Sequence, residues 1–136
     1  IDVFPPTQQA QIRALLAESI EAVIAQTLLK KITGGRIPAL EIMTGTTAIR
    51  NLIREGKIHQ IPGTMQVSQK DGMQTMDMSL ASHVKAGRIS QQMAFERCHD
   101  PEELQRLVGG GFAGAMIDDG YNTSAGMSMG GSMGGM

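Results

Sequence analysis

A short stretch near the middle of the chain, from Thr46 to Gly56, divides it into two parts with different patterns of apolar residues. A threonine can accept a hydrogen bond from the first turn of a helix, and a glycine can end a helix in the left-handed conformation. The stretch therefore predicts a helix over Ala48 to Glu55. Any fold of this chain has to place that helix between two sections. In the first, the spacing of apolar residues is partly that of helices and partly that of strands, and in the second it is mainly that of helices.

The first section begins with a predicted helix. Pro5 and Pro6 end a short apolar entry strand, and Thr7 can cap the helix that follows. The apolar residues then recur at intervals of three and four, so we expect one helical stripe that is buried along its length. The residues of this stripe are Ile12, Leu15, Leu16, Ile20, Val23 and Ile24.

A β-hairpin is predicted next. Residues 27–32 form a short apolar run, Gly34 and Gly35 supply a turn, and residues 37–43 alternate between two faces as a strand does. Pro38 lacks a backbone N–H, which favours an edge position for its strand.

The section after Gly56 predicts several short helices. Residues 57–68 have helical spacing, but a proline and a glycine inside them shorten or kink any helix. Residues 74–86 form an amphipathic helix, and residues 90–98 form another that Ser90 caps. Asp100, followed by proline and then by glutamate, marks the start of a last helix.

The composition changes at Gly109, after which ten glycines and five methionines occur among 28 residues. Ordering such a segment costs more backbone entropy than it can recover by burial, so we expect a flexible tail. The predicted organisation is residues 1–45 as a mixed α/β section, 46–108 as a helical region and 109–136 as the tail.

Composition excludes several classes of function. A net charge of −1 and four scattered aromatic residues give neither an electrostatic footprint nor a stacking surface for nucleic acid. The single cysteine, Cys98, allows no internal disulfide and suits a reducing compartment. No apolar run reaches 18 residues, so we expect a cytoplasmic protein without direct membrane insertion.

No complete catalytic, cofactor-binding or metal motif is present. The nearest match to a phosphate-binding loop, at Gly56 and Lys57, has Asn51 where glycine is required and Ile58 where serine or threonine must hold magnesium. The G-x-S-x-G pattern occurs twice, but only inside the glycine-rich tail. The three histidines share no metal-ligand spacing, and Cys98 lacks an orienting group for a catalytic thiol. Tail methionines could bind cuprous ion, although a flexible extension is the favoured interpretation.

The predicted central helix carries an apolar stripe and an arginine pair. Ile49, Leu52 and Ile53 have the spacing of a core-facing stripe, while Arg50 and Arg54 lie one turn apart with no opposing charge on that face. Either the arginines form a solvated basic face, or they form a docking surface.

The residues Ala48, Ile49, Arg50, Asn51, Leu52, Ile53, Arg54 and Glu55 spell AIRNLIRE, which resembles letter for letter the motif of the type IV pilus retraction ATPases, the PilT family. Other strings resemble the family in order and spacing, over about residues 1–108. They are Asp2–Pro5, Leu16–Ser19, Ala25–Leu28, Gly35–Ile42, His59–Ile61, Gly72–Asp77 and Pro101–Leu104.

The resemblance implies the end of a RecA-like P-loop ATPase core, with a helix and a β-hairpin, followed by a C-terminal helical region. It also implies a homo-hexameric motor that uses ATP and Mg²⁺, lies on the cytoplasmic side of the inner membrane and acts with a platform protein at the pilus base. The matching strings begin downstream of the family's nucleotide-binding motifs, so a chain with only these residues should not hydrolyse ATP. The AIRNLIRE residues become candidates for coupling hydrolysis to retraction.

Two alternatives to a retraction motor remain. The chain could be a stand-alone interaction or regulatory module that docks on a full-length motor, or a part of a pilus-extension or type II secretion ATPase. Because residue 1 is Ile and the first residues are apolar, we expect a piece of a longer protein.

Overall fold

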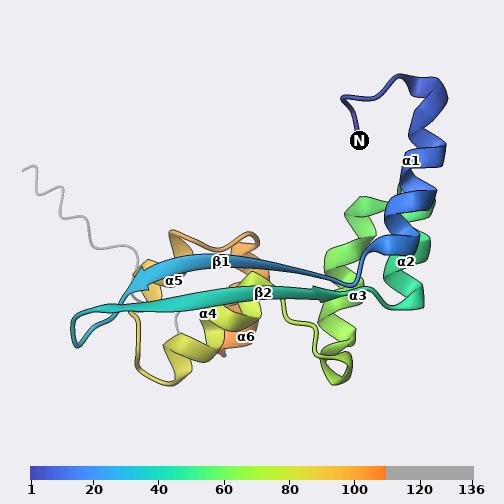
Figure 1. The fold of residues 1–136 in the computed structure, drawn as a ribbon. Helices are drawn as coiled ribbons and strands as arrows, with labels where there is room; N and C mark the ends of the chain where they lie inside the picture. The colour runs from blue at the N-terminus through green and yellow to red at the C-terminus, as the bar shows by residue number, and fades with distance from the viewer. Residues whose placement is uncertain (110–136) are drawn as a thin grey trace, which may run out of the picture.

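The computed structural model describes residues 1–109, which form a mixed α/β fold built on one long β-hairpin (Figure 1). The expected tail and its copper-binding alternative fall outside the described residues. The helices and strands are α1 (Pro6–Ser19), β1 (Ala22–Lys30), β2 (Arg36–Thr44), α2 (Thr47–Arg54), α3 (Ile61–Val67), α4 (Met76–Lys85), α5 (Gln91–Phe95) and α6 (Pro101–Val108), with 3₁₀ turns at Ile58–Gln60 and Gln69–Asp71.

The hairpin pairs β1 and β2 antiparallel over their full length, from Ala22 opposite Thr44 to Lys30 opposite Arg36. The predicted turn is confirmed, since Gly34 and Gly35 both adopt positive φ angles, of 89° and 75°. The helices lie in two groups along the hairpin, with α1, α2 and α3 at the end opposite the turn and α4, α5 and α6 towards the turn (Figure 1).

The predicted boundary between the first helix and the hairpin is wrong. α1 ends at Ser19, and Ile20 is already extended, so Val23 and Ile24 belong to β1. Strand pairing explains the difference, because every residue of β1 from Ala22 onward has a partner in β2. The predicted entry strand is also absent, since the four residues before Pro5 form a turn and bend.

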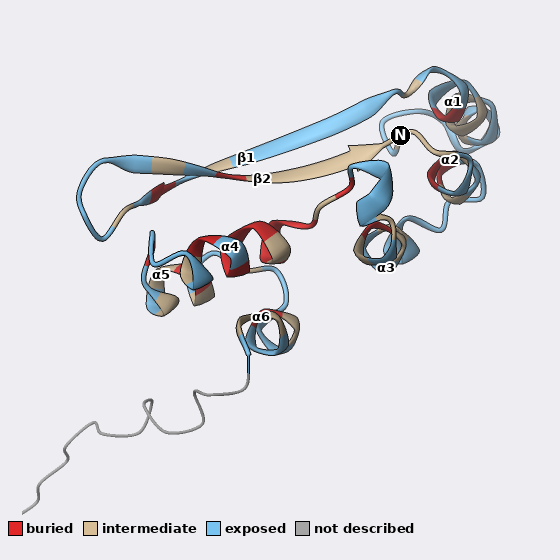
Figure 2. Ribbon diagram, turned by 90° about the horizontal axis from the view of Figure 1, so that it is seen from below, coloured by how far each residue is buried: buried red, intermediate tan, exposed pale blue. Residues whose placement is uncertain are grey.

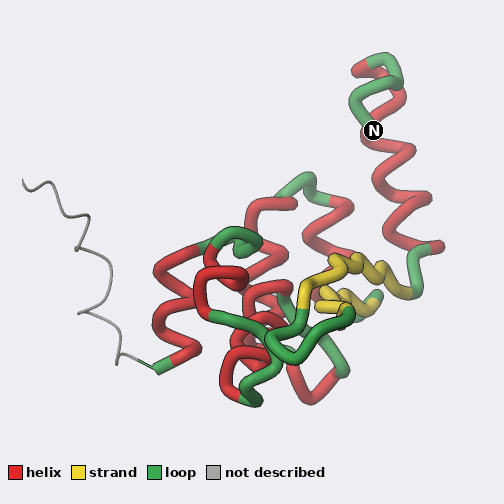
Figure 3. The backbone as a smooth tube through the Cα atoms, turned by 90° about the vertical axis from the view of Figure 1, so that its left-hand side faces the viewer, coloured by secondary structure: helices red, strands yellow, loops and turns green. Residues whose placement is uncertain are grey.

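The expected buried stripe of α1 is wrong as well. Ala17 is the only buried residue of this helix, whereas Leu15 and Leu16 are 55% and 39% exposed. α1 projects from the end of the hairpin and packs on α2, so most of its circumference meets no other described element (Figures 1 and 3).

Two separate hydrophobic clusters hold the helices to the hairpin (Figure 2). The first lies near the turn, where Leu29 and Ala39 of the hairpin pack against Leu80 of α4 and Leu104 of α6. The second lies at the other end. Its buried residues are Ala17, Ile49, Ile53, Met65 and Met73.

Three predicted helix starts in the second half of the chain are confirmed, but the predicted helix end at Cys98 is wrong, since α5 ends at Phe95 and a turn follows. Thr46, Ser90 and Asp100 each accept a hydrogen bond from the first turn of the helix that they precede. Gly56 and Gly87 follow their helices with φ angles of 71° and 66°. The proline and glycine in residues 57–68 shorten that segment to the seven-residue α3.

Replacing Ile49 by Ala should lower the free energy of unfolding by about 2–5 kcal/mol, because its side chain is fully buried in the second cluster. The matched control is Ile32→Ala in the hairpin turn, where 63% of the residue is exposed and a change of about 0.5 kcal/mol is expected. Urea unfolding of both variants measures the difference. Equal losses would place Ile49 outside the core.

Candidate functional site

The helix α2, which carries the AIRNLIRE residues, presents one face to the core and another to solvent. Ile49 and Ile53 are buried, as the apolar spacing predicted, but Leu52 is only half-buried. Thr46 Oγ1 accepts a hydrogen bond from the Ile49 backbone N–H at 3.4 Å, which fixes the first turn.

Arg50 joins α2 to the end of α1. Its Nε donates to the Gly45 carbonyl at 2.6 Å, and its Nη1 donates to the carbonyls of Ala17 and Glu18 at 3.1 and 2.5 Å. Its Nη2 forms an ion pair with Glu21 Oε1 at 3.1 Å. The expectation that the charge of Arg50 has no opposing group is therefore wrong, because that group lies about 30 residues away along the chain.

The local structure explains why an arginine is needed there. The last carbonyls of a helix lack partners within it, and α1 has no basic residue in its last turn. A planar guanidinium can satisfy several of these oxygens at once, which a lysine ammonium does less well. Gly45 completes the junction, because a Cβ atom at this position would collide with the Ile20 carbonyl oxygen. We call the contacts of Arg50 with Ala17, Glu18, Glu21 and Gly45 the Arg50 junction. The junction fixes α1, α2 and the adjoining ends of the two strands relative to one another.

The solvent face of α2 has a separate polar arrangement. Arg54 Nη1 donates to Asn51 Oδ1 at 2.8 Å, and both residues are exposed. Glu55 pairs with Lys57 at 2.7 Å, and the hydrogen bond and charge of this lysine lower the pKa of the Glu55 carboxyl. These four polar residues can contact another protein without breaking the core.

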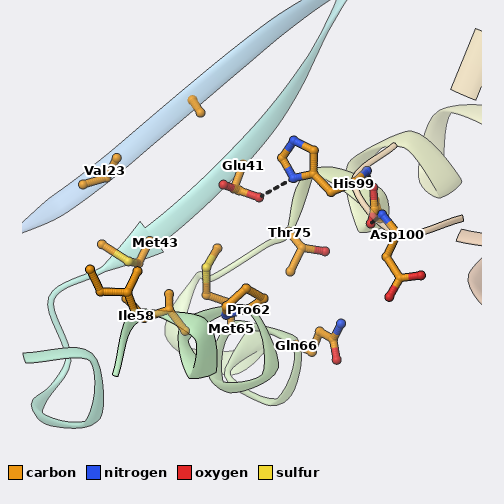
Figure 4. Close-up of a pocket in the computed structure, with 13 residues that line it drawn as sticks. Val23, Glu41, Met43, Ile58, Pro62, Met65, Gln66, Thr75, His99 and Asp100 are labelled. Carbon is orange, nitrogen blue, oxygen red and sulfur yellow. Dashed lines mark hydrogen bonds and ion pairs between the residues drawn. The ribbon is translucent and has the colours of Figure 1, made fainter. Parts of the chain in front are cut away.

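A cleft of about 510 Å³ opens between the hairpin, α3 and the start of α4 (Figure 4). One wall is apolar and includes Met43, Ile58 and Met65. The opposite rim carries Glu41 and His99, whose Oε2 and Nδ1 atoms are 3.9 Å apart.

The acidic groups of this cleft are engaged with backbone. Glu41 Oε2 accepts from the Met76 N–H at 3.1 Å, at the start of α4. The buried Asp77 accepts from the N–H groups of His99 and Asp100 at 2.8 and 2.9 Å. Sequence reasoning missed both roles, because each joins residues more than 20 positions apart. These carboxylates of the cleft therefore help to hold the fold.

The other candidate side chains are not brought together. His83 is buried with Nε2 2.9 Å from the Pro38 carbonyl, whereas His59 is exposed. Cys98 Sγ donates to the Phe95 carbonyl at 3.2 Å, and burial, followed by the negative charge of Asp77, raises the pKa of its thiol. A raised pKa disfavours the thiolate that a nucleophile needs.

Comparison with known proteins identifies relatives of the chain. It is 51% identical over 104 residues to the type IV pilus retraction ATPase PilT of Pseudomonas aeruginosa. It is 46% identical over 105 residues to a twitching motility protein of Neisseria gonorrhoeae. The chain is homologous to a portion of PilT. Each match includes 76% of this chain, but the chain spans only 30% and 28% of the lengths of these two relatives.

A solved structure supports the homology with PilT. The crystal structure of a pilus retraction motor PilT with bound ADP has a TM-score of 0.68 to this chain and 44% sequence identity. The match covers 77% of this chain and 29% of the PilT chain. No family model matches the chain. The mixed α/β fold is therefore shared with part of PilT.

Within residues 1–109, the stretch that comes nearest to a phosphate-binding loop does not have the geometry of one, although homology with an ATPase implies ATP for a whole PilT-like protein. Gly56 ends α2 instead of opening a helix, and Lys57 pairs with Glu55. Within residues 1–109, no group of three or more His, Cys, Asp and Glu side chains could hold a metal ion. None of the helices in this part of the chain has the length and apolarity that a membrane crossing requires.

Replacing Arg50 by Ala should lower the free energy of unfolding by about 2–4 kcal/mol, because several carbonyls lose a charged donor. Arg50→Lys should recover only part of this loss, since one ammonium cannot reproduce the fork of donors. Arg54→Ala is the control and should change the free energy of unfolding by about 0.5 kcal/mol, since the Arg54 side chain is exposed. Urea unfolding measures all three, and an Arg50→Ala variant as stable as the control would contradict the junction.

Cys98 should react with Ellman's reagent at pH 8 more slowly in the folded chain than in urea, because the reagent needs the thiolate and burial raises the pKa of the thiol in the folded state. The rate should still be rising above pH 9. A folded chain that reacts as fast as the unfolded chain would show instead an accessible, activated thiol.

Proposed function

We propose that the chain is the C-terminal part of a hexameric, ATP-driven motor that retracts type IV pili by removing pilin, as in twitching motility. The motor would lie in the cytoplasm, peripheral to the inner membrane, and would act with a platform protein at the pilus base. The observation that carries the proposal is the 51% identity to PilT over 104 residues, which include a fully formed AIRNLIRE helix.

ATP and Mg²⁺ would bind in another portion of such a motor, because the residues of this chain do not provide the site. What this chain would supply is the end of the RecA-like core and the helical region that follows it. Its own residues would then bind neighbouring parts of the motor and transmit movement.

The distribution of exposed apolar side chains supports such a context. Among residues 1–109, ten large hydrophobic residues are at least 39% exposed, and eight of these lie within residues 1–32, in the entry segment, α1 and the hairpin. Exposed apolar side chains concentrated in one region mark an interaction surface. The section that resembles the end of an ATPase core is therefore the section that needs covering by other protein. These eight are Val3, Phe4, Leu15, Leu16, Val23, Ile24, Leu28 and Ile32.

The roles within α2 divide by exposure. Ile49 and Ile53 anchor the helix in the core, and Arg50 ties it to α1 and the hairpin. Asn51 and Arg54 bond to each other on the exposed face, so we assign coupling to them. A movement of the hairpin would reach these two side chains through the Arg50 junction.

A chimera tests the function. The matching portion of the P. aeruginosa PilT is replaced by this chain, and the protein is assayed for ATP hydrolysis and for twitching in a strain that lacks PilT. We expect both activities to be restored. A folded chimera that hydrolyses ATP and gives no twitching would contradict a retraction motor, and would favour a module with a different partner.

The same chimera tests coupling. Asn51→Ala with Arg54→Ala should reduce retraction at least about tenfold and leave hydrolysis within about twofold, because neither side chain contributes to the core. The control is Lys70→Ala, an exposed lysine on another element, which should change neither activity. If hydrolysis falls in proportion to retraction, the pair acts in catalysis or assembly rather than in coupling.

A further inference from the structure

A second cleft, of about 610 Å³, lies at the turn end of the hairpin, beside α5. It is far from α2, which packs at the opposite end of the hairpin (Figure 1). The residues that line it are Leu28, Lys30, Gly35, Arg36, Met93 and Arg97. Its function is not explained by the homology with PilT or by the AIRNLIRE helix.

The charge of this cleft is of one sign. Lys30 and Arg36 are directly opposite each other in the hairpin, an arrangement of like charges that costs stability, and Arg97 adds a third positive charge from the segment after α5. Within residues 1–109, the structure shows no carboxylate paired with any of these three side chains. An anionic group in the cleft would relieve this repulsion.

The cleft also has an apolar part. Leu28 is 54% exposed and Met93 is half-buried at the edge of the first hydrophobic cluster. A ligand that matches the cleft therefore combines bulky apolar groups with adjacent negative charges. A fully hydrated anion alone would leave Leu28 and Met93 uncovered.

One segment of this chain has that composition. Residues 112–119, with the sequence FAGAMIDD, contain Phe112, Met116 and Ile117 followed by Asp118 and Asp119. These aspartates are the only charged side chains beyond residue 109. The segment has one glycine in eight residues, whereas the 17 residues after it contain six, so ordering its backbone costs less entropy per residue than ordering those 17 residues on average.

The chain length allows the contact. Val108, at the end of α6, packs against the same hydrophobic cluster as Met93 of the cleft. Asp118 follows Gly109 by nine residues, which can span up to about 30 Å when extended. Because the segment is tethered, its effective concentration near the cleft is on the order of millimolar, so weak charge-based contacts suffice.

We propose that this cationic cleft binds residues 112–119 of the same chain, with Asp118 and Asp119 against Lys30, Arg36 and Arg97. The apolar residues of the segment cover Leu28 and Met93. The proposed contact therefore lies beside the turn of the hairpin. This inference does not depend on the proposed motor function.

Zero-length carbodiimide cross-linking of the full chain, with mapping by mass spectrometry, tests the proposal. We expect Lys30 to be joined to Asp118 or Asp119 within a single chain, and Lys70, on a distant 3₁₀ turn, to give at least about fivefold less product with them. Arg36→Gln with Arg97→Gln should reduce the Lys30 product at least about fivefold. The control Arg13→Gln with Arg54→Gln removes two arginines elsewhere and should leave the yield unchanged.

Two further measurements complete the test. A mixture of ¹⁴N- and ¹⁵N-labelled chains distinguishes the occupants, and cross-links mainly between differently labelled chains would overturn the proposal in favour of a second copy. In NMR spectra, Asp118→Asn with Asp119→Asn should shift the backbone amides of Lys30, Arg36 and Arg97 and leave those of α2 unmoved. Equal cross-linking of Lys30 and Lys70, or no shift at the cleft, would also overturn it.

Discussion

The guanidinium of Arg50 lies where four elements of the fold meet, and the placement of α1 depends on it more than on apolar burial. α1 buries only Ala17, so little hydrophobic free energy holds this helix against α2. The same arginine satisfies the carbonyls of Ala17, Glu18 and Gly45, which would otherwise depend on water. Charged donors to neutral acceptors are among the stronger hydrogen bonds in proteins, and here several converge on one side chain.

This junction has a consequence for how α2 could transmit force. The hairpin is long and fully paired, and its end is bonded to α2 through Gly45 and Arg50. If the proposed coupling holds, a displacement of the hairpin would reach α2 through these bonds. The exposed side chains of Asn51 and Arg54 would be the last members of that chain of contacts, which is the arrangement that a coupling element requires.

Sequence patterns predicted the local features of this fold and missed the long-range ones. The caps at Thr46, Ser90 and Asp100 were predictable because each acts within its own helix. The end of α1 was mispredicted because pairing with a distant strand, which helical spacing does not include, placed Val23 in the hairpin. The role of Arg50 was missed for the same reason, since its acceptors on α1 lie 32 and 33 residues away.

The strings that resemble the PilT family also meet in space, and this limits what their similarity can mean. Glu41, in the string Gly35–Ile42, accepts a hydrogen bond from the backbone N–H of Met76 in the string Gly72–Asp77, and Ile42 pairs with Gln74 between the same two strings. The first of these bonds gives the Glu41 side chain a role in the fold itself. Arg50 also has such a role, although its charge first suggested a docking role. Asn51 and Arg54 bond only to each other within the described residues, so the coupling proposal rests on the pair whose identity the fold does not require.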